Sequence, residues 1–114
     1  MGTLDGIRIV ELATVILGPW ATQMLGDMGA DVIKVETPEG DTTRNLGPRR
    51  NEGMASMYMA ANRNKRSVVL DLEDEGERAM LLRLASGADF FIESERPGRL
   101  AELGLGYDDL ASLN

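Results

Sequence analysis

The sequence predicts an α/β fold of the doubly wound, Rossmann-like type with a mainly parallel sheet, and three observations lead to it. Short runs rich in branched apolar residues alternate with stretches in which apolar residues recur at helical spacing. The first strand, helix and strand fit within about 30 residues, the size of a βαβ unit with a right-handed crossover. The 114-residue chain is 43% hydrophobic and 27% charged, an ordinary mix for one globular domain.

The first third of the chain contains two expected strands with a helix between them. Residues 6–12 (GIRIVEL) and 30–36 (ADVIKVE) have the composition of buried parallel strands. Pro19 stands where the first turn of a helix favours proline, and Gly29 supplies a left-handed end. The apolar residues of this helix are expected to face the core, and they are Trp20, Ala21, Met24, Leu25 and Met28.

The rest of the chain adds a loop, two strands and four helices. Prolines and glycines mark residues 37–52 as loop. The further elements are a short helix over 54–62, a strand over 67–72, a helix over 74–86, a strand over 88–93 and short helices over 97–103 and 107–113. In the 54–62 helix we expect Met57, Ala60 and Ala61 to face inward. The spacing of Met24, Met28, Met54, Met57 and Met59 is typical of core residues rather than of an adaptable groove.

The composition excludes several kinds of chemistry. The chain has no cysteine and no histidine, which rules out zinc sites built on them, disulfides, and Ser–His–Asp or Cys–His catalysis within it. A net charge of −7 disfavours nucleic acid and anionic membranes as partners. The longest apolar stretch, 12–17, is too short for an export signal or a membrane span, so a cytoplasmic location is expected.

The acidic chain contains one basic segment. Residues 44–66 hold six bases and one acid, a net +5, and the remainder carries −12. This basic segment is either an anion site or a solvated loop. Within it, Asn64, Lys65 and Arg66 combine the donors that bind phosphate oxygens. The alternative is that these side chains cap strand ends or pair with Glu36 and Asp71.

A dinucleotide site is disfavoured at the first strand–helix turn. Residues 13–19 contain a single glycine, Gly18, in place of the G-x-G-x-x-G pattern. Glu36 stands where an acid would bind a ribose. Without the glycines, however, the backbone does not approach a pyrophosphate closely.

A string of matches resembles the opening of the class III CoA transferases, a family that also includes carnitine CoA-transferase-like proteins and alpha-methylacyl-CoA racemase. The matching stretches cover nearly the whole chain and are residues 4–11, 18–19, 25–36, 40–41 with Arg44, 62–67, 70–72, 88–89, 96–98 and 103–105. The resemblance implies that residues 1–114 are the CoA-binding, Rossmann-like N-terminal segment of a longer enzyme, one that forms homodimers of interlocked chains. It implies coenzyme A as the carrier, acyl-CoA and carboxylic acids as substrates, and no metal.

The resemblance also implies where the chemistry lies. Transferases of the family use an aspartate that attacks the acyl-CoA and becomes an aspartyl-CoA thioester, whereas the racemases use a histidine and an acid. The family's catalytic aspartate aligns beyond Asn114, so no catalytic residue is expected in this chain. We therefore interpret Asp27, Asp71, Asp89 and Asp108 as capping or surface groups. A third reading is a non-catalytic nucleotide-binding or scaffold domain.

The family's CoA contacts map onto four segments of this sequence. They correspond to Ile16, Leu17, Thr37, Leu70, Asp71, Leu72, Glu73, Ser94, Glu95 and Arg96, to which the basic segment adds Asn64, Lys65 and Arg66. Ser94-Glu95 replaces a common Asn-aromatic pair, and Glu102 replaces a common arginine, so Arg96 and Arg99 are expected to compensate. Ile16 stands where formyl-CoA transferases carry glutamine, which argues against that substrate.

Overall fold

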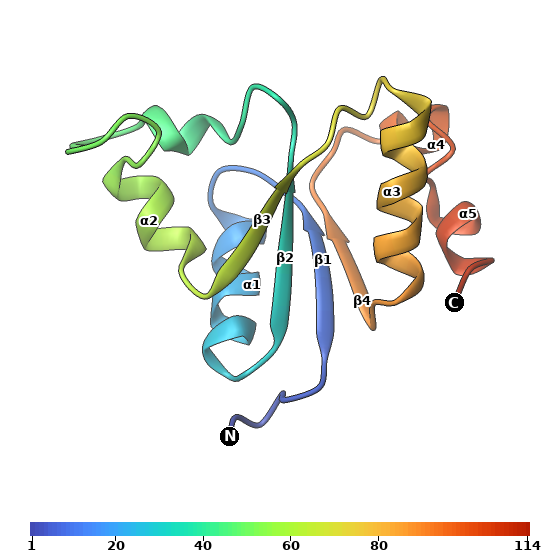
Figure 1. Cartoon of the computed structure of the whole chain (residues 1–114), viewed down its shortest axis with the longest axis horizontal. Helices are drawn as coiled ribbons and strands as arrows, with labels where there is room; N and C mark the ends of the chain where they lie inside the picture. Colours follow the sequence, from blue (N-terminus) through green and yellow to red (C-terminus); the bar gives the residue numbers. More distant parts are fainter.

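The computed structural model describes residues 1–114 and contains one sheet of four parallel strands (Figure 1). The strands are β1 (Arg8–Leu12), β2 (Asp31–Glu36), β3 (Lys65–Val69) and β4 (Phe90–Glu93). Their order across the sheet is β3-β2-β1-β4, and each neighbouring pair is parallel. The α/β class and the parallel sheet are therefore confirmed.

Helices cover both faces of the sheet. Figure 1 shows α1 and α2 on one side and α3, α4 and α5 on the other. Their bounds are α1 (Leu17–Asp27), α2 (Ser56–Asn62), α3 (Glu75–Ser86), α4 (Arg99–Glu102) and α5 (Tyr107–Ala111). A 3-10 helix, η1 (Thr42–Asn45), lies inside the segment expected to be loop. The side chain of Asp41 caps it by accepting a hydrogen bond from the backbone N–H of Thr43.

The larger apolar core lies between the sheet and α3. Alternate strand residues supply it together with the following helices, and its buried members are Val10, Leu12, Val35, Leu70, Leu72, Leu81, Ala88, Leu100 and Leu105. On the other face, Ile9 and Val32 form a smaller cluster against Leu25 of α1. The two faces differ because this second face also buries the charged side chains of Glu11 and Lys34, and Glu11 accepts a hydrogen bond from Thr22 of α1.

The orientation of α1 differs from the one predicted, because only Leu25 of the five residues expected to face inward packs against the core. Trp20 is 56% exposed and Met24 is 54% exposed, while Thr22 and Gln23 are buried. The helix buries its polar side because the sheet beneath it carries charged groups, and Thr22 donates a hydrogen bond to Glu11. Helical spacing alone shows which residues share a face, but not which face turns inward.

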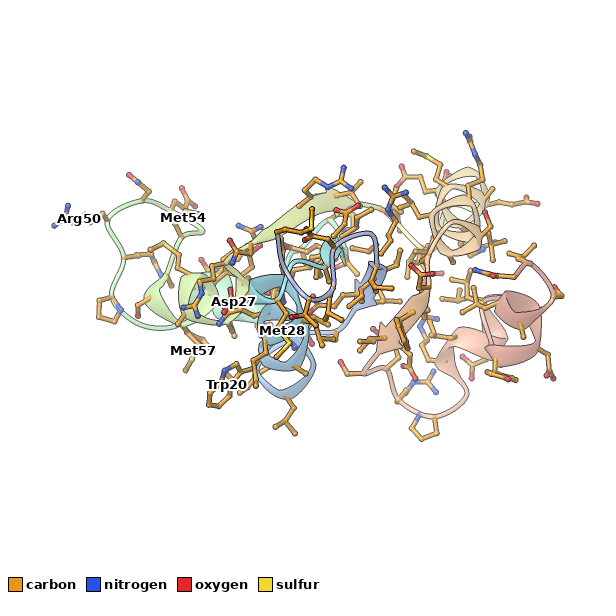
Figure 2. All side chains as sticks on the ribbon, turned by 90° about the horizontal axis from the view of Figure 1, so that it is seen from below. Trp20, Asp27, Met28, Arg50, Met54 and Met57 are labelled. Carbon is orange, nitrogen blue, oxygen red and sulfur yellow. The ribbon has the colours of Figure 1, made fainter.

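The prediction that the methionines are core residues is also wrong. Met57 and Ala60 of α2 are exposed, and the buried residues of that helix are Tyr58, Ala61 and Asn62. All five methionines of this group (Met24, Met28, Met54, Met57 and Met59) are exposed. Figure 2 shows Trp20 and Met57 pointing outward from α1 and α2 on the same side of the molecule.

Two local features of the chain have clear physical causes. Gly29 ends the first helical segment with φ +108°, as predicted, and a Cβ there would clash with Asp5 Oδ1. Strand β3 begins two residues earlier than expected and ends at Val69, because Lys65 pairs in register with Val32 of β2. Leu70 and Leu72 follow the strand and are buried in the core.

Candidate functional site

The strand order creates a topological switch point between β1 and β4. The chain leaves β1 toward β2 on one side, whereas β4 flanks β1 on the other side. In open parallel sheets, ligands bind outside the carboxyl ends of the strands at such a point. Here the loop after β1 and the segment after β4 meet, because the backbone N–H of Thr14 donates to Ser94 Oγ at 3.3 Å.

The loop after β1, residues 13–16, leads into an uncapped helix. No side chain caps the N-terminus of α1, and neither Leu17 nor Gly18 donates its backbone N–H within the chain. Such free N–H groups at a helix start favour a negatively charged ligand. Two predicted contacts lie here: Ile16 is the N-cap residue, and the side chain of Leu17 is 85% exposed.

A second group of predicted residues lines one pocket at the same edge of the sheet. The pocket has a volume of about 230 Å³ and includes Thr37, Asp71, Leu72, Glu73 and Glu95 from three different segments. Its single base, Arg99, pairs with Glu73, and Glu39 adds a further acid. The acidic lining is better suited to the hydroxyl groups and ring amino groups of a ligand, which donate hydrogen bonds, than to negatively charged phosphates.

The other predicted residues near this edge have structural partners. Leu70 is buried in the apolar core. Arg96 is exposed and pairs with Glu102 at 3.1 Å. Thus the residue expected to compensate for Glu102 is held by Glu102 in this structure.

Asn64, Lys65 and Arg66 are not brought together with the other predicted residues. They lie at the start of β3, at the amino end of the strands. Asn64 Nδ2 donates to Asp27 Oδ1, and Arg66 forms an ion pair with Asp31 at 2.7 Å. These residues therefore lie at the opposite edge of the sheet from the switch point.

The basic segment does not assemble into one anion site. Four of its six bases (Arg44, Arg63, Lys65 and Arg66) pair with acids from elsewhere in the chain. Those acids are Glu36, Asp27, Glu11 and Asp31. Of the two acids predicted as partners for this part of the chain, Glu36 pairs with one of these bases, Arg44, and Asp71 pairs with none of the four. A charge count along the sequence cannot show the long-range pairing that neutralises the segment.

A buried charged network was not predicted as part of the site. Lys34 Nζ lies 2.9 Å from Ala13 O, 3.0 Å from Asp41 Oδ2 and 3.4 Å from Glu11 Oε1. Lys34 is 1% exposed and Glu11 is fully buried. Asp41 Oδ2 has no hydrogen bond of good geometry, but the nearby ammonium group pairs its charge. One sequence signal existed: Glu11 and Lys34 each stand between apolar residues of an expected buried strand, and the two are in register.

Lys65 completes this network from the third strand. Its side chain is 2% exposed, and its ammonium group lies 2.8 Å from Glu11 Oε2 and 2.8 Å from Asn62 Oδ1. Burial lowers the pKa of Lys65, and the hydrogen bond to Glu11 opposes that effect. The lysine predicted to contact phosphate thus contributes its charge to the interior of this chain.

A second buried cluster surrounds Glu36 at the end of β2. Arg44 Nη2 lies 2.7 Å from Glu36 Oε1, and the Tyr58 hydroxyl donates to the same oxygen at 2.8 Å. Burial acts to raise the pKa of Glu36, but hydrogen bonds from Arg44, Tyr58 and the backbone of Asp41 lower it to about 2. Glu36 is therefore occupied by protein partners rather than open to a ribose.

The Glu36 cluster predicts a specific pH dependence of stability. Because its folded pKa is about 2 and its usual value is 4.5, ionised Glu36 stabilises the fold above pH 4.5. That contribution, about 3 kcal/mol, is lost as the pH falls from 4.5 through 2. In Glu36→Gln, the free energy of unfolding should therefore fall less steeply between pH 4.5 and 2 than in the parent protein. Hydrogen exchange of β2 amides measures this free energy, and the exposed control Glu52→Gln should keep the parent slope. Identical pH profiles for the Glu36 variant and the parent protein would contradict this assignment.

Three of the four aspartates interpreted as capping or surface groups have partners within the chain. Asp27 pairs with Arg63, Asp71 accepts from the backbone of Glu73, and Asp89 accepts from the backbone of Arg8. Asp108 lies in the first turn of α5.

No group of three or more acidic, cysteine or histidine residues could hold a metal ion. No helix has the length and apolar character needed to cross a membrane.

Comparison with known proteins places this chain in a family. The sequence profile of CoA-transferase family III matches residues 4–114. The chain is 51% identical to a succinate–glutarate CoA-transferase from Agrobacterium fabrum, covering 97% of this chain and 30% of that protein. It is 44% identical to an acetyl-CoA:oxalate CoA-transferase from Acetobacter aceti, covering 99% of this chain and 29% of that protein.

Solved structures agree with this assignment. A CAIB/BAIF family protein from Brucella suis superposes with a TM-score of 0.94 at 46% identity, covering 99% of this chain and 31% of that one. A hypothetical protein from Mycobacterium tuberculosis gives a TM-score of 0.91 at 43% identity, covering 100% and 31%. The chain spans about 30% of the length of the relatives that it matches. The chain belongs to CoA-transferase family III.

Proposed function

We propose that residues 1–114 form the CoA-binding N-terminal segment of an enzyme that transfers CoA from an acyl-CoA thioester to a carboxylic acid. The observation that carries this proposal is the switch-point edge, where the free N–H groups at the start of α1 lie near the carboxyl end of β4. Relatives named for succinate, glutarate and oxalate favour small dicarboxylic acids as substrates.

The two parts of this edge suit different parts of a CoA thioester. The helix N-terminus of α1 favours a negatively charged group, such as a phosphate or the carboxylate of a dicarboxylic acyl group. The acidic pocket around Thr37 and Glu73 offers acceptors to ribose hydroxyls and ring amino groups. Coenzyme A is the carrier in this proposal, and no residue of the segment is assigned to a metal.

The reaction proceeds through an enzyme carboxylate. An aspartate outside residues 1–114 attacks the thioester carbonyl, which forms a mixed anhydride and releases the CoA thiolate. The thiolate then attacks the aspartyl carbonyl and frees the donor acid, leaving an aspartyl-CoA thioester. The acceptor carboxylate next attacks this thioester and forms a new anhydride with the aspartyl group. The released thiolate attacks the acceptor carbonyl, which gives the new acyl-CoA and restores the aspartate.

Incubation of the complete protein with succinyl-CoA and glutarate tests the proposal. We expect glutaryl-CoA and succinate in equal amounts, measured by mass spectrometry. Deuterium uptake at the carbon next to the carbonyl of a branched acyl-CoA, without transfer, would support the alternative of a racemase. Absence of both reactions and of CoA binding would instead support a nucleotide-binding or scaffold domain.

The Arg96–Glu102 pair predicts two changes of opposite sign. Arg96→Ala should weaken CoA binding by about two- to fivefold, because an exposed base next to the site is lost. Glu102→Ala should tighten binding by about twofold, because it frees Arg96 and removes a negative charge. Calorimetric Kd values at low and high salt check both, since the two effects should shrink with salt. Changes of the same sign in the two variants would contradict this role.

We also propose that the complete protein is a homodimer of interlocked chains acting in the cytoplasm. The exposed apolar face of α1 and α2, formed by Leu17, Trp20, Met24, Met28 and Met57, supports an association surface. Monomeric proteins rarely leave large contiguous apolar patches exposed to water. Trp20 and the methionines are also residue types enriched at protein interfaces.

A further inference from the structure

The loop between β1 and α1 is held in a strained conformation. Val15 has φ +69°, in the left-handed region that a β-branched residue rarely adopts. Such a residue persists only where its surroundings determine the backbone, and it commonly marks a functional site. The loop lies at the switch point, directly before the uncapped start of α1.

Two buried charged side chains form hydrogen bonds with the backbone of this loop. Lys34 Nζ donates to Ala13 O at 2.9 Å, before the strained residue. Asp41 Oδ1 accepts from the N–H of Val15 itself at 3.4 Å. The two side chains also pair with each other, Nζ to Oδ2, at 3.0 Å.

Asp41 is itself fixed in place from the opposite side. Its Oδ1 accepts hydrogen bonds from the Thr43 N–H at 2.9 Å and from Thr43 Oγ1 at 2.7 Å. Its own backbone N–H donates to Glu36 Oε2 at 3.1 Å. The pair of Lys34 and Asp41, called the clamp below, therefore connects the loop to the end of β2 and to the start of η1.

A purely stabilising role does not explain this arrangement well. Desolvation of two buried charges costs about as much as their attraction returns, so apolar residues of similar volume often serve stability equally. What an apolar pair could not do is hydrogen-bond to both Ala13 O and the Val15 N–H. The charges are thus placed where they control the backbone of one loop.

We propose that Lys34 and Asp41 are positioning residues that hold loop 13–16, and with it the N-terminus of α1, in the conformation that receives acyl-CoA. The identity of the ligand in this inference rests on the proposed function, whereas the clamp rests on the contacts of Lys34 and Asp41. Neither side chain touches the ligand in this account. Both act through the loop backbone.

The test compares variants of the complete protein by two measurements: the calorimetric Kd for CoA, and amide hydrogen exchange of residues 14–18. Lys34→Met and Asp41→Leu should each weaken CoA binding by about tenfold and speed exchange in this loop. Asp41→Asn keeps an oxygen acceptor for Val15 and Thr43, so it should restore most of the affinity lost in Asp41→Leu. The double variant should lose no more than the worse single variant, because both changes release the same loop.

Tyr58→Phe is the matched control. It removes the hydrogen bonds of the Tyr58 hydroxyl with Glu36 Oε1 and Arg44, but not the bond from Asp41 to Glu36 Oε2. The Tyr58 hydroxyl has no hydrogen bond with residues 13–16. We expect this variant to lose stability while its Kd for CoA stays within about twofold of the parent value. An equal loss of affinity in Tyr58→Phe would overturn the positioning role, since general destabilisation would then explain all the variants.

The two proposals fail in different ways. If Lys34→Met is folded and binds CoA as the parent does, with unchanged exchange in the loop, the clamp is overturned and the proposed function stands. If the parent protein binds no CoA, the proposed function is overturned. Hydrogen exchange alone then decides the clamp: faster exchange confined to residues 14–18 supports it, and unchanged exchange overturns it.

Discussion

Glu11→Gln is expected to destabilise the fold by about 3–5 kcal/mol, because it leaves buried ammonium groups without their shared carboxylate. Glu11 Oε2 lies 2.8 Å from Lys65 Nζ, and Glu11 Oε1 lies 3.4 Å from Lys34 Nζ. The amide keeps the shape and can still accept from Thr22, so the loss measures charge rather than packing. Asp41 would remain as the one carboxylate for two lysines.

Urea unfolding followed by hydrogen exchange of β1 and β2 amides measures this effect. Glu52→Gln is the matched control because it makes the same chemical change on an exposed loop residue, and it should change the free energy of unfolding by less than about 0.5 kcal/mol. A loss below about 1 kcal/mol in Glu11→Gln would mean that the two lysines do not depend on this carboxylate.

Trp20→Glu is expected to raise the dissociation constant of the proposed homodimer by at least about 30-fold, the size of an interface hot spot. Trp20 is exposed in this chain, as are Met24 and Met28 of the same helical segment. In Figure 2 it lies on the same side of the molecule as Met57. A charge placed there would have to be desolvated on association. Analytical ultracentrifugation of the complete protein over a concentration series measures the change.

Tyr107→Glu is the control for the Trp20 variant. Tyr107 is also an exposed aromatic residue, but it lies on α5 and not on the apolar face of α1 and α2. It should leave the dissociation constant unchanged. If Trp20→Glu keeps the parent dissociation constant and instead lowers the unfolding temperature, the face is covered by another part of the same chain.

The sheet and its helices could be predicted because local patterns determine them. The β-branched run at 6–12 and the acids at the start of α3 act over a few residues, and both elements form as expected. Thr37 and residues 71–73 were expected at the carboxyl ends of parallel strands, and the structure brings them together in one pocket. That a ligand binds there stays a prediction. These inferences need no knowledge of long-range contacts.

The parts that were not predicted depend on contacts between distant residues. The buried side of α1 follows from Glu11 and Lys34 beneath it, so the apolar spacing of the helix pointed to the wrong face. The basic segment lost its free charge to acids such as Asp27 and Asp31, which lie far away in the sequence. Residues 64–66 directly precede or begin β3, so they lie at the amino edge of the sheet, away from the carboxyl ends where the other predicted contacts lie.

We propose that coenzyme A binds to this segment at the carboxyl edge of its sheet. Residue-resolved hydrogen exchange of the complete protein, with and without saturating CoA, tests it most directly. We predict slower exchange at residues 14–18, 71–73 and 94–96, and no change at residues 64–66. Protection confined to residues 64–66, or no protection anywhere in residues 1–114, would contradict the claim.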